Sequence, residues 1–357
     1  MIKWFIQNYP DYVTQMRACS YHSNNNINLH HLEGDVWSHT MLSYSKGLNF
    51  GVSKTVLIAL FLHDIGRIFT RYIDSKGSVS FGDFEGVSCF VSLDILNKLD
   101  LSENEKVDIL KIIMNQYNVI DFVKYDETSF DKFVKKYEYN EELVKYLFSY
   151  VKCDLFGRII DSSKSKYYDL SKIQFYEKEA SSLKLTHKKK VDKDKKNLYI
   201  LIGLPCSGKS RWIEENHKDA FLISRDYCID TIGKKYAKKS HDEAYELQDK
   251  NENISKEVDE LYESRLKNSY ATSEDVIVDN LNLRFEVRQK IITRYKDTHN
   301  IYGVLFLKSY NYILNCDKKR TKSENKTIGK TLLIKNMMKF RFPMLKEGFD
   351  DIEYIFE

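Results

Sequence analysis

The sequence predicts two domains, an all-α helical domain followed by an α/β domain built on a parallel sheet. Three observations lead to this prediction. Up to residue 185 apolar residues recur at helical spacing, and from residue 197 short apolar runs alternate with helical segments. Between them, residues 186–196 are charged and almost free of apolar side chains. We therefore expect domains at 1–185 and 197–357, joined by a linker at 186–196.

Composition limits the class of protein. The 357 residues are 42% hydrophobic, which is enough apolar material for real cores and excludes wholesale disorder. No apolar run approaches the ~20 residues needed to cross a bilayer, and the first residues do not resemble a secretory signal. The six cysteines form no CxxC pair and are typical of free thiols in a reducing compartment. We expect a cytoplasmic protein without a membrane partner.

Three segments of the first domain are predicted to be helices. Ser53 can cap a helix over residues 54–63, and residues 86–99 form a second candidate. Residues 141–161 carry apolar side chains at helical spacing. A short hairpin around residues 78–81 is the one strand candidate before the linker.

In the second domain four short apolar runs are predicted to be strands: residues 198–202, 220–224, 276–279 and 301–307. Helical segments separate them, which favours a parallel sheet covered on both faces. The net charge is −2 over residues 1–185 and +6 over the remainder. A mildly basic second half suits either a phosphate-bearing partner or a merely solvated surface.

Residues 203–210 (GLPCSGKS) match the phosphate-loop pattern G-x-x-x-x-G-K-[ST] between a predicted strand and a predicted helix. Glycines let the backbone turn its N–H groups toward phosphates, and the helix adds its positive N-terminal end. Lys209 would reach the β- and γ-phosphates, and Ser210 would ligate Mg²⁺. We predict that ATP or another nucleoside triphosphate binds here, at Gly203, Ser207, Gly208, Lys209 and Ser210. The alternative is a glycine-rich turn that matches by chance.

Asp226 follows the second apolar run and can accept a proton from an attacking hydroxyl. The alternative is a helix N-cap. Further candidates are charged residues near the ends of the second and third runs and a basic stretch in the tail: Arg225, Asp279, Arg284, Arg288 and residues 320–330. A solvated basic face is the alternative for the tail stretch.

Together the phosphate loop, the Arg225-Asp226 pair, residues 279–282 (DNLN) and residues 347–350 (EGFD) resemble the polynucleotide 5′-hydroxyl kinase branch of P-loop phosphotransferases, over residues 197–357. The resemblance implies that Asp226 is the general base. It also implies a lid that closes on the ATP phosphates with Arg320 as its arginine and Lys326 and Lys330 nearby. The family often carries an arginine three residues after the catalytic aspartate, where this chain has Ile229.

A second set of residues suggests a metal site. His39 is followed at a helix end by His63-Asp64, and Asp154 lies on an apolar helix. An adjacent imidazole and carboxylate can bind one cation, and a buried unpaired carboxylate would be costly. The alternatives are a core histidine at 63 and an ion pair of Asp154 with Arg158, one turn away.

This pattern resembles the HD phosphohydrolase superfamily, over residues 15–180, which implies an HD-type helical fold. The implied ligands of a divalent transition metal, Mg²⁺ or Mn²⁺ are His39, His63, Asp64 and Asp154. Residues 33–37 (EGDVW) and 153–158 (CDLFGR) look especially like HD domains fused to polynucleotide kinases. Where those domains commonly carry a further histidine, this chain has Asp83, Phe84 and Glu85. We therefore expect one metal, and hydrolysis that is slow, confined to activated substrates such as a cyclic phosphate, or absent.

The whole chain is thus similar to bifunctional HD-domain polynucleotide kinases. The resemblance implies an enzyme that phosphorylates 5′-hydroxyl ends of RNA or DNA and hydrolyses a 2′,3′-cyclic or terminal phosphate. No ligase motif is apparent, so a separate ligase would seal the break. Two alternatives stay open: a small-molecule or nucleoside kinase fused to an HD nucleotidase, and a kinase whose HD domain is a non-catalytic nucleic-acid-binding platform.

Overall fold

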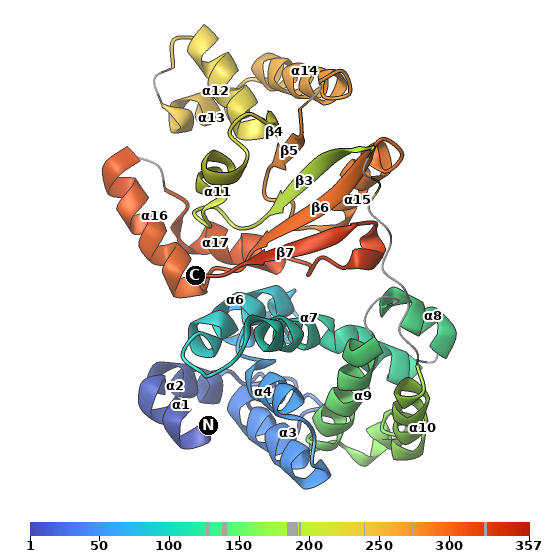
Figure 1. Cartoon of the computed structure of the whole chain (residues 1–357). Coiled ribbons are helices and arrows are strands. Elements are labelled where there is room, and N and C mark those ends of the chain that lie inside the picture. The colour runs from blue at the N-terminus through green and yellow to red at the C-terminus, as the bar shows by residue number, and fades with distance from the viewer. Residues whose placement is uncertain are drawn as a thin grey trace. The chain divides into compact units, whose positions relative to one another are not determined.

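The computed structural model describes residues 1–125, 129–137, 141–183, 192, 194–238, 240–272, 274–324 and 327–357 (Figure 1). The chain divides into two compact units. The first comprises Met1–His187 and Met337–Phe342, and the second comprises Lys188–Asn336 and Pro343–Glu357. Within the described ranges, no helix is long and apolar enough to cross a membrane.

The first unit is mainly helical, with a two-stranded antiparallel hairpin where the sequence suggested one. The hairpin pairs β1 (Tyr72–Ile73) with β2 (Val79–Ser80). The helices are α1 (Ile2–Asn8), α2 (Pro10–Ala18), α3 (Val36–Phe50), α4 (Lys54–Leu62), α5 (Arg67–Thr70), α6 (Phe84–Leu96), α7 (Glu103–Tyr125), α8 (Phe130–Val134), α9 (Glu141–Phe156) and α10 (Leu170–Ser181), with 3₁₀ turns η1 (Lys135–Tyr137) and η2 (Ser162–Tyr167).

Local signals explain where the site-bearing helices start and end. The Ser53 hydroxyl accepts a hydrogen bond from the Val56 amide at 3.3 Å and so caps α4 as predicted. The Asp35 carboxylate accepts one from the Ser38 amide at 2.9 Å and caps α3. These caps place His39 in the first turns of α3 and His63 directly after α4.

Helix α4 packs against α3, α7 and α9, so the residues that follow it lie in the middle of the unit. Helix α9 ends at Phe156, earlier than the predicted residue 161, because the chain turns at Gly157. A Cβ on Gly157 would lie 2.4 Å from Ser43 Oγ and 2.6 Å from Ser43 Cα. Only glycine permits this close approach of α9 to α3, which brings Asp154 next to His39.

The second unit contains a five-stranded parallel sheet in the order β4-β5-β3-β6-β7, as Figure 1 shows. The strands are β3 (Lys196–Ile202), β4 (Phe221–Ser224), β5 (Val276–Asp279), β6 (His299–Phe306) and β7 (Asp351–Ile355). The helical elements are α11 (Lys209–Asn216), α12 (Arg225–Lys235), α13 (His241–Lys250), α14 (Glu252–Asn268), α15 (Phe285–Tyr295), α16 (Tyr310–Glu324), α17 (Gly329–Met338) and the turn η3 (Leu345–Glu347). Four of the strands fall on the four predicted apolar runs. Because all strands are parallel, their carboxyl ends meet at one edge.

The segment that forms β7 was not predicted to be a strand. This segment pairs with β6 at the side of the sheet, and its acidic residues Asp351 and Glu353 are exposed while Ile352 is buried. Short edge strands with charged outward side chains lack the continuous apolar run of the interior strands. The segment before it is fixed by Asp350, whose carboxylate accepts a hydrogen bond from the Ile301 amide at 2.7 Å.

Candidate phosphate loop and metal centre

The loop between β3 and α11 has the backbone conformation that its glycines predict. Gly208 caps α11 with a φ of 94°, in the left-handed region that favours glycine. Cys206 also has a positive φ, 61°, which is uncommon for a residue with a side chain and is concentrated at functional loops. The Gly203 amide donates to the carbonyl of Leu281, which fixes the loop to the neighbouring segment after β5.

Lys209 and Ser207 have the environment of phosphate ligands. The Lys209 ammonium donates to the carbonyls of Gly203 at 3.1 Å and Leu204 at 2.9 Å, so it lies folded back over the loop. The Ser207 hydroxyl is buried and has no hydrogen-bond partner among the described residues. A buried hydroxyl without a partner is unfavourable, and a phosphate oxygen would satisfy it. Ser210 is exposed at the start of α11, open to a cation.

Two carboxylates lie at the same edge of the sheet as Lys209. Ser224, at the end of β4, caps α12 through a bond from the Tyr227 amide. The N-cap alternative for Asp226 is therefore not what the structure contains: Asp226 is an exposed residue of the first turn. Asp279 ends the neighbouring strand β5 and pairs in register with Ser224.

The charges at this edge influence one another. Burial lowers the pKa of Lys209, and the nearby Asp279 and Asp226 act in the opposite direction. Burial raises the pKa of Asp279, which Lys209 lowers and Asp226 raises. The three groups therefore form one electrostatic cluster beside the loop.

The predicted arginines have different environments. The Arg225 amide donates to Asn280 Oδ1 at 3.1 Å, and its guanidinium pairs with Asp259 of α14. Arg284 is exposed at the start of α15. Arg288 differs from the substrate contact that we expected, because its side chain is fully buried and binds both carboxylate oxygens of Glu347 at 2.7 Å. Arg288 also donates to two loop carbonyls and so braces the chain before β7.

The tail stretch contributes Arg320, on α16, whose side chain is half-buried and pairs with Asp317 at 3.4 Å. The positive charge of Arg320 acts to lower the pKa of both Cys206 and Lys209 in the loop. Asp317 also accepts hydrogen bonds from the Ile328 and Gly329 amides at 3.0 Å, which fixes the start of α17. Lys330 is exposed in that first turn, and Lys326 lies outside the described residues.

In the first unit the four predicted metal ligands come together. His39 Nε2 lies 3.0 Å from Asp154 Oδ1, and His63 Nε2 lies 3.5 Å from the same oxygen. His63 Nε2 is also 3.4 Å from Asp64 Oδ2. Two donors that bind one cation at ~2.1 Å lie roughly 3.0–3.4 Å apart, so this spacing fits a shared ion. His63 Nε2 is buried and has no hydrogen-bond partner among the described residues, as a ligand atom would.

Outer contacts orient both imidazoles. His63 Nδ1 lies 2.8 Å from the Leu60 carbonyl, and His39 Nδ1 lies 3.0 Å from Glu33 Oε1. A donor at Nδ1 leaves Nε2 for a cation. Burial by itself would lower the pKa of His39, but its bonds to Asp154 and Glu33 raise it to about 9. The centre therefore favours positive charge, which a bound metal would supply in place of the proton.

Arginines take the remaining carboxylate oxygens. Arg67 Nε lies 2.7 Å from Asp64 Oδ1, and Arg158 pairs with Asp154 Oδ2. The ion-pair alternative for Asp154 is thus present together with the histidine contacts. Despite burial, these partners hold the pKa of both carboxyls below its usual range. The other oxygen of Asp154 lies 3.0 Å from His39 Nε2, so Arg158 and a cation can be bound at once. Asp64 differs, because its Oδ2 also accepts a hydrogen bond from the Tyr21 hydroxyl at 2.8 Å and Asp64 is not part of the group formed by His39, His63 and Asp154.

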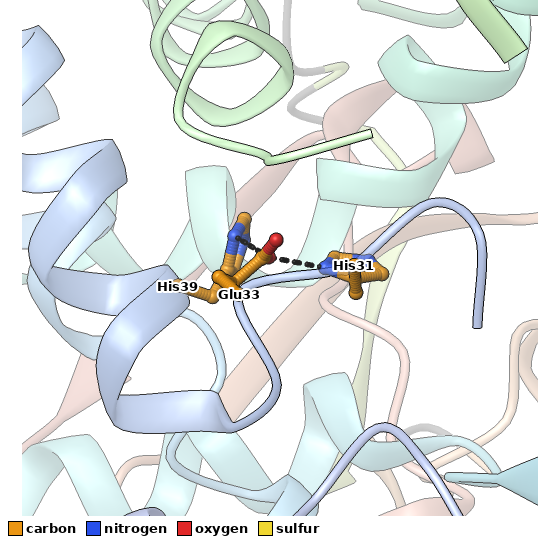
Figure 2. Close-up of side chains that lie close together, drawn as sticks. All are labelled: His31, Glu33 and His39. Atoms are coloured by element: carbon orange, nitrogen blue, oxygen red, sulfur yellow. Dashed lines mark hydrogen bonds and ion pairs between the residues drawn. The ribbon is translucent and has the colours of Figure 1, made fainter. Parts of the chain in front are cut away.

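Neither His31 nor Glu33 is among the site residues predicted from the sequence. Figure 2 shows Glu33 between the two histidines: its Oε1 lies 2.7 Å from His31 Nδ1 and 3.0 Å from His39 Nδ1. Its other oxygen accepts from the Ile159 amide at 2.9 Å. The three side chains lie close enough to hold an ion themselves. The clustering of five of the nine histidines between residues 22 and 63 was the available signal.

The carboxylates that stand in place of a further histidine lie elsewhere. Asp83 is exposed and pairs with Arg341 at 2.7 Å. Burial raises the pKa of Glu85. Neither belongs to the two groups of potential metal ligands found within the described part of the chain, which are His31, Glu33 and His39, and His39, His63 and Asp154.

Comparison with known proteins bears on the second unit. A family model described as an AAA domain matches residues 198–342. The match contains the phosphate loop, most of β3, strands β4 to β6 and the α16–α17 segment, and it supports a P-loop domain of the kinase-like type in this part of the chain. Such a domain binds a nucleoside triphosphate and Mg²⁺. No curated protein matches the chain.

Proposed function

We propose that the chain heals nucleic-acid ends. The second unit would transfer the γ-phosphate of a nucleoside triphosphate to the 5′-hydroxyl of an RNA or DNA strand. The first unit would be an HD phosphohydrolase that removes a 2′,3′-cyclic or terminal phosphate. The observation that carries the proposal is the presence, in one chain, of a phosphate loop facing an exposed carboxylate and a buried His/Asp set with cation spacing.

In the proposed kinase reaction each residue has a defined task. The loop amides and Lys209 hold the phosphates and stabilise the charge that develops on them. The Asp226 carboxylate accepts the proton of the attacking hydroxyl. Its exposure suits this role, because the acceptor end must reach it from solvent. Arg320, fixed by Asp317, would add charge at the phosphates when the tail closes on them.

In the proposed hydrolase, His39, His63, Asp64 and Asp154 would hold the divalent cation. A cation there would polarise a phosphoryl oxygen and activate a water. The protein's own contribution is orientation: Glu33 and the Leu60 carbonyl fix the imidazoles, and Arg67 and Arg158 fix the carboxylates.

The proposal is tested with one oligonucleotide that carries a 5′-hydroxyl and a 2′,3′-cyclic phosphate. Incubation of the full chain with ATP, Mg²⁺ and Mn²⁺, followed by mapping of both ends, should show a new 5′-phosphate and an opened cyclic phosphate. A 5′-phosphate with an intact cyclic end would reduce the proposal to the kinase. Failure at both ends would overturn it.

The alternative of a small-molecule kinase fused to a nucleotidase is separated by acceptor choice. A preference for nucleosides over a 5′-hydroxyl oligonucleotide, compared as kcat/KM, would favour that alternative. A first unit that binds RNA but no metal would instead favour the non-catalytic platform. Under the end-healing proposal a separate ligase would join the products.

A further inference from the structure

Basic side chains from four separate segments of the first unit gather around Tyr168, on one side of Asp154. His30, from the loop before α3, has its Nδ1 3.0 Å from the Tyr168 hydroxyl. Lys124, in the last turn of α7, has its Nζ 5.6 Å from the centre of the Tyr168 ring. Arg158 follows α9 and pairs with Asp154. Lys164, in η2, is near enough for its charge to lower the pKa of His30.

Lys124, Arg158 and Lys164 supply the positive charge of this cluster, and the acidic groups that act on it are Asp121, Asp154 and Glu33. Burial lowers the pKa of His30 to about 4, and Lys124, Arg158 and Lys164 act in the same direction. Burial lowers the pKa of Lys124 to about 8, with Arg158 adding to the effect. The acidic groups that face Lys124 are Asp121 and Asp154. Asp154 also lies close to His39 and His63, so its charge is shared between Arg158 and the two histidines.

Arg158 provides an independent sign of a missing ligand. Its side chain is 6% exposed, and one terminal nitrogen pairs with Asp154. Its Nε is buried and has no hydrogen-bond partner among the described residues. A buried charged donor without an acceptor is unfavourable, and guanidinium groups bind phosphate through two parallel hydrogen bonds.

The metal ligands themselves are no more than 1% exposed, whereas His30, Lys124 and Tyr168 are half-buried. The cluster therefore extends from solvent to Arg158, and Arg158 touches a metal ligand. A phosphate oxygen on Arg158 would consequently lie beside the cation.

We propose that Arg158, Lys124, His30 and Tyr168 form the subsite that binds the phosphate group of the phosphoester hydrolysed by the first unit. The subsite rests on the proposed hydrolase function, because it assigns the substrate's phosphate to a defined side of the metal centre. It predicts a substrate recognised through its phosphate oxygens.

Titration calorimetry with inorganic phosphate tests the subsite. The full chain carries Lys209→Ala in every sample, so that the phosphate loop competes weakly. Lys124→Gln should weaken phosphate binding about tenfold or more, since it removes one charge-assisted hydrogen bond. Lys124→Arg should keep most of the affinity. Lys132→Gln, at an exposed lysine of α8, is the matched control and should leave it unchanged. Tyr168→Phe, which keeps the ring, is a second test and should weaken binding about threefold.

Unchanged phosphate affinity in folded Lys124→Gln and Tyr168→Phe proteins would overturn the subsite. If Lys124→Gln does not fold, as judged by its thermal transition, Tyr168→Phe and Lys124→Arg decide. With Lys209 intact, opening of a 2′,3′-cyclic phosphate should show a raised KM and a similar kcat for Lys124→Gln. Lys124-dependent phosphate binding without any hydrolysis by the parent chain would refute the hydrolase but keep the anion site. Hydrolysis by the parent chain, together with phosphate binding that does not depend on Lys124, would keep the hydrolase and refute the subsite.

Discussion

Single side chains decide the chemistry of both candidate sites. At the sheet edge, Ser224 caps α12 and thereby frees the Asp226 carboxylate for another role. In the helical unit, one oxygen of Asp154 faces the histidines while the other pairs with Arg158. In both cases a neighbouring polar group makes the contact that the fold requires: Ser224 caps α12, and Arg158 pairs with one oxygen of Asp154. The Asp226 carboxylate and the other oxygen of Asp154 are therefore left for a different contact.

Lys209→Ala and Asp226→Ala should each reduce 5′-phosphorylation by at least about a hundredfold, because they remove phosphate stabilisation and the proton acceptor. Hydrolysis by the first unit should be unaffected. Lys218→Ala and Asp219→Ala, at exposed positions before β4, serve as controls. Transfer of labelled γ-phosphate to an oligonucleotide measures the effect, and near-normal transfer by either variant removes that residue from the proposed mechanism.

Glu33→Gln should weaken metal binding about 10- to 100-fold, since an outer carboxylate orients the ligating imidazole. The change keeps the size of the side chain but weakens the acceptor shared by His31 and His39. Mn²⁺ affinity of the full chain, measured by calorimetry, checks this without reference to catalysis. Glu103→Gln, at an exposed position of α7, is the control. Equal Mn²⁺ affinity in both variants would argue against an orienting role for Glu33.

At the scale of elements, contacts between helices, strands and loops place these side chains. The close approach of α9 to α3 at Gly157 brings Asp154 to His39. The parallel pairing of β4 with β5 brings Asp279 level with Ser224, next to the residue pair that opens α12. The Arg288–Glu347 pair joins α15 to the turn before β7.

Arg288→Met should lower the free energy of unfolding by about 3–5 kcal/mol, because it leaves the buried Glu347 carboxylate without its partner. Arg284→Met, at an exposed position, should change stability by less than about 0.5 kcal/mol. Urea denaturation of the two variants measures the difference. Equal stability, with a selective loss of oligonucleotide binding by Arg288→Met, would return Arg288 to the substrate-contact role.

For the molecule as a whole, the residues of each candidate site lie in one unit. The phosphate loop, Asp226, Asp279 and Arg320 all belong to the second unit, and the four candidate metal ligands belong to the first. The chain does not divide at a single point, because Met337–Phe342 belongs to the first unit. There the ring of Phe340 lies 5.0 Å from that of Phe90.

Because the two candidate sites lie in separate units, the proposed function predicts that His63→Ala and Asp64→Ala abolish hydrolysis while the kinase activity stays within about twofold of the parent. Both activities are measured on one preparation of the full chain, at a temperature below its thermal transition. Gln116→Ala gives a control, since it removes a hydrogen bond to the His63 carbonyl but no metal ligand. Parallel loss of both activities would contradict independent sites.

The features that depend on neighbouring residues could be predicted from the amino-acid order alone. Four strands, the Ser53 cap and the phosphate loop follow from spacing, capping and glycine positions, since these act over a few neighbouring residues. The sequence also allowed a set of candidate metal ligands to be predicted, because their residue types are those that bind cations: His39, His63, Asp64 and Asp154.

The partner that each polar group contacts became clear from the folded chain and not from the sequence. Arg284 and Arg288 are one turn apart, yet one is exposed and the other is buried against Glu347. Glu33 meets His39, and Lys124 and His30 approach Arg158, because segments distant in sequence pack together. Edge strand β7 likewise exists through its pairing with β6. Burial and long-range pairing are properties of the packed chain, and local sequence spacing carries no record of them.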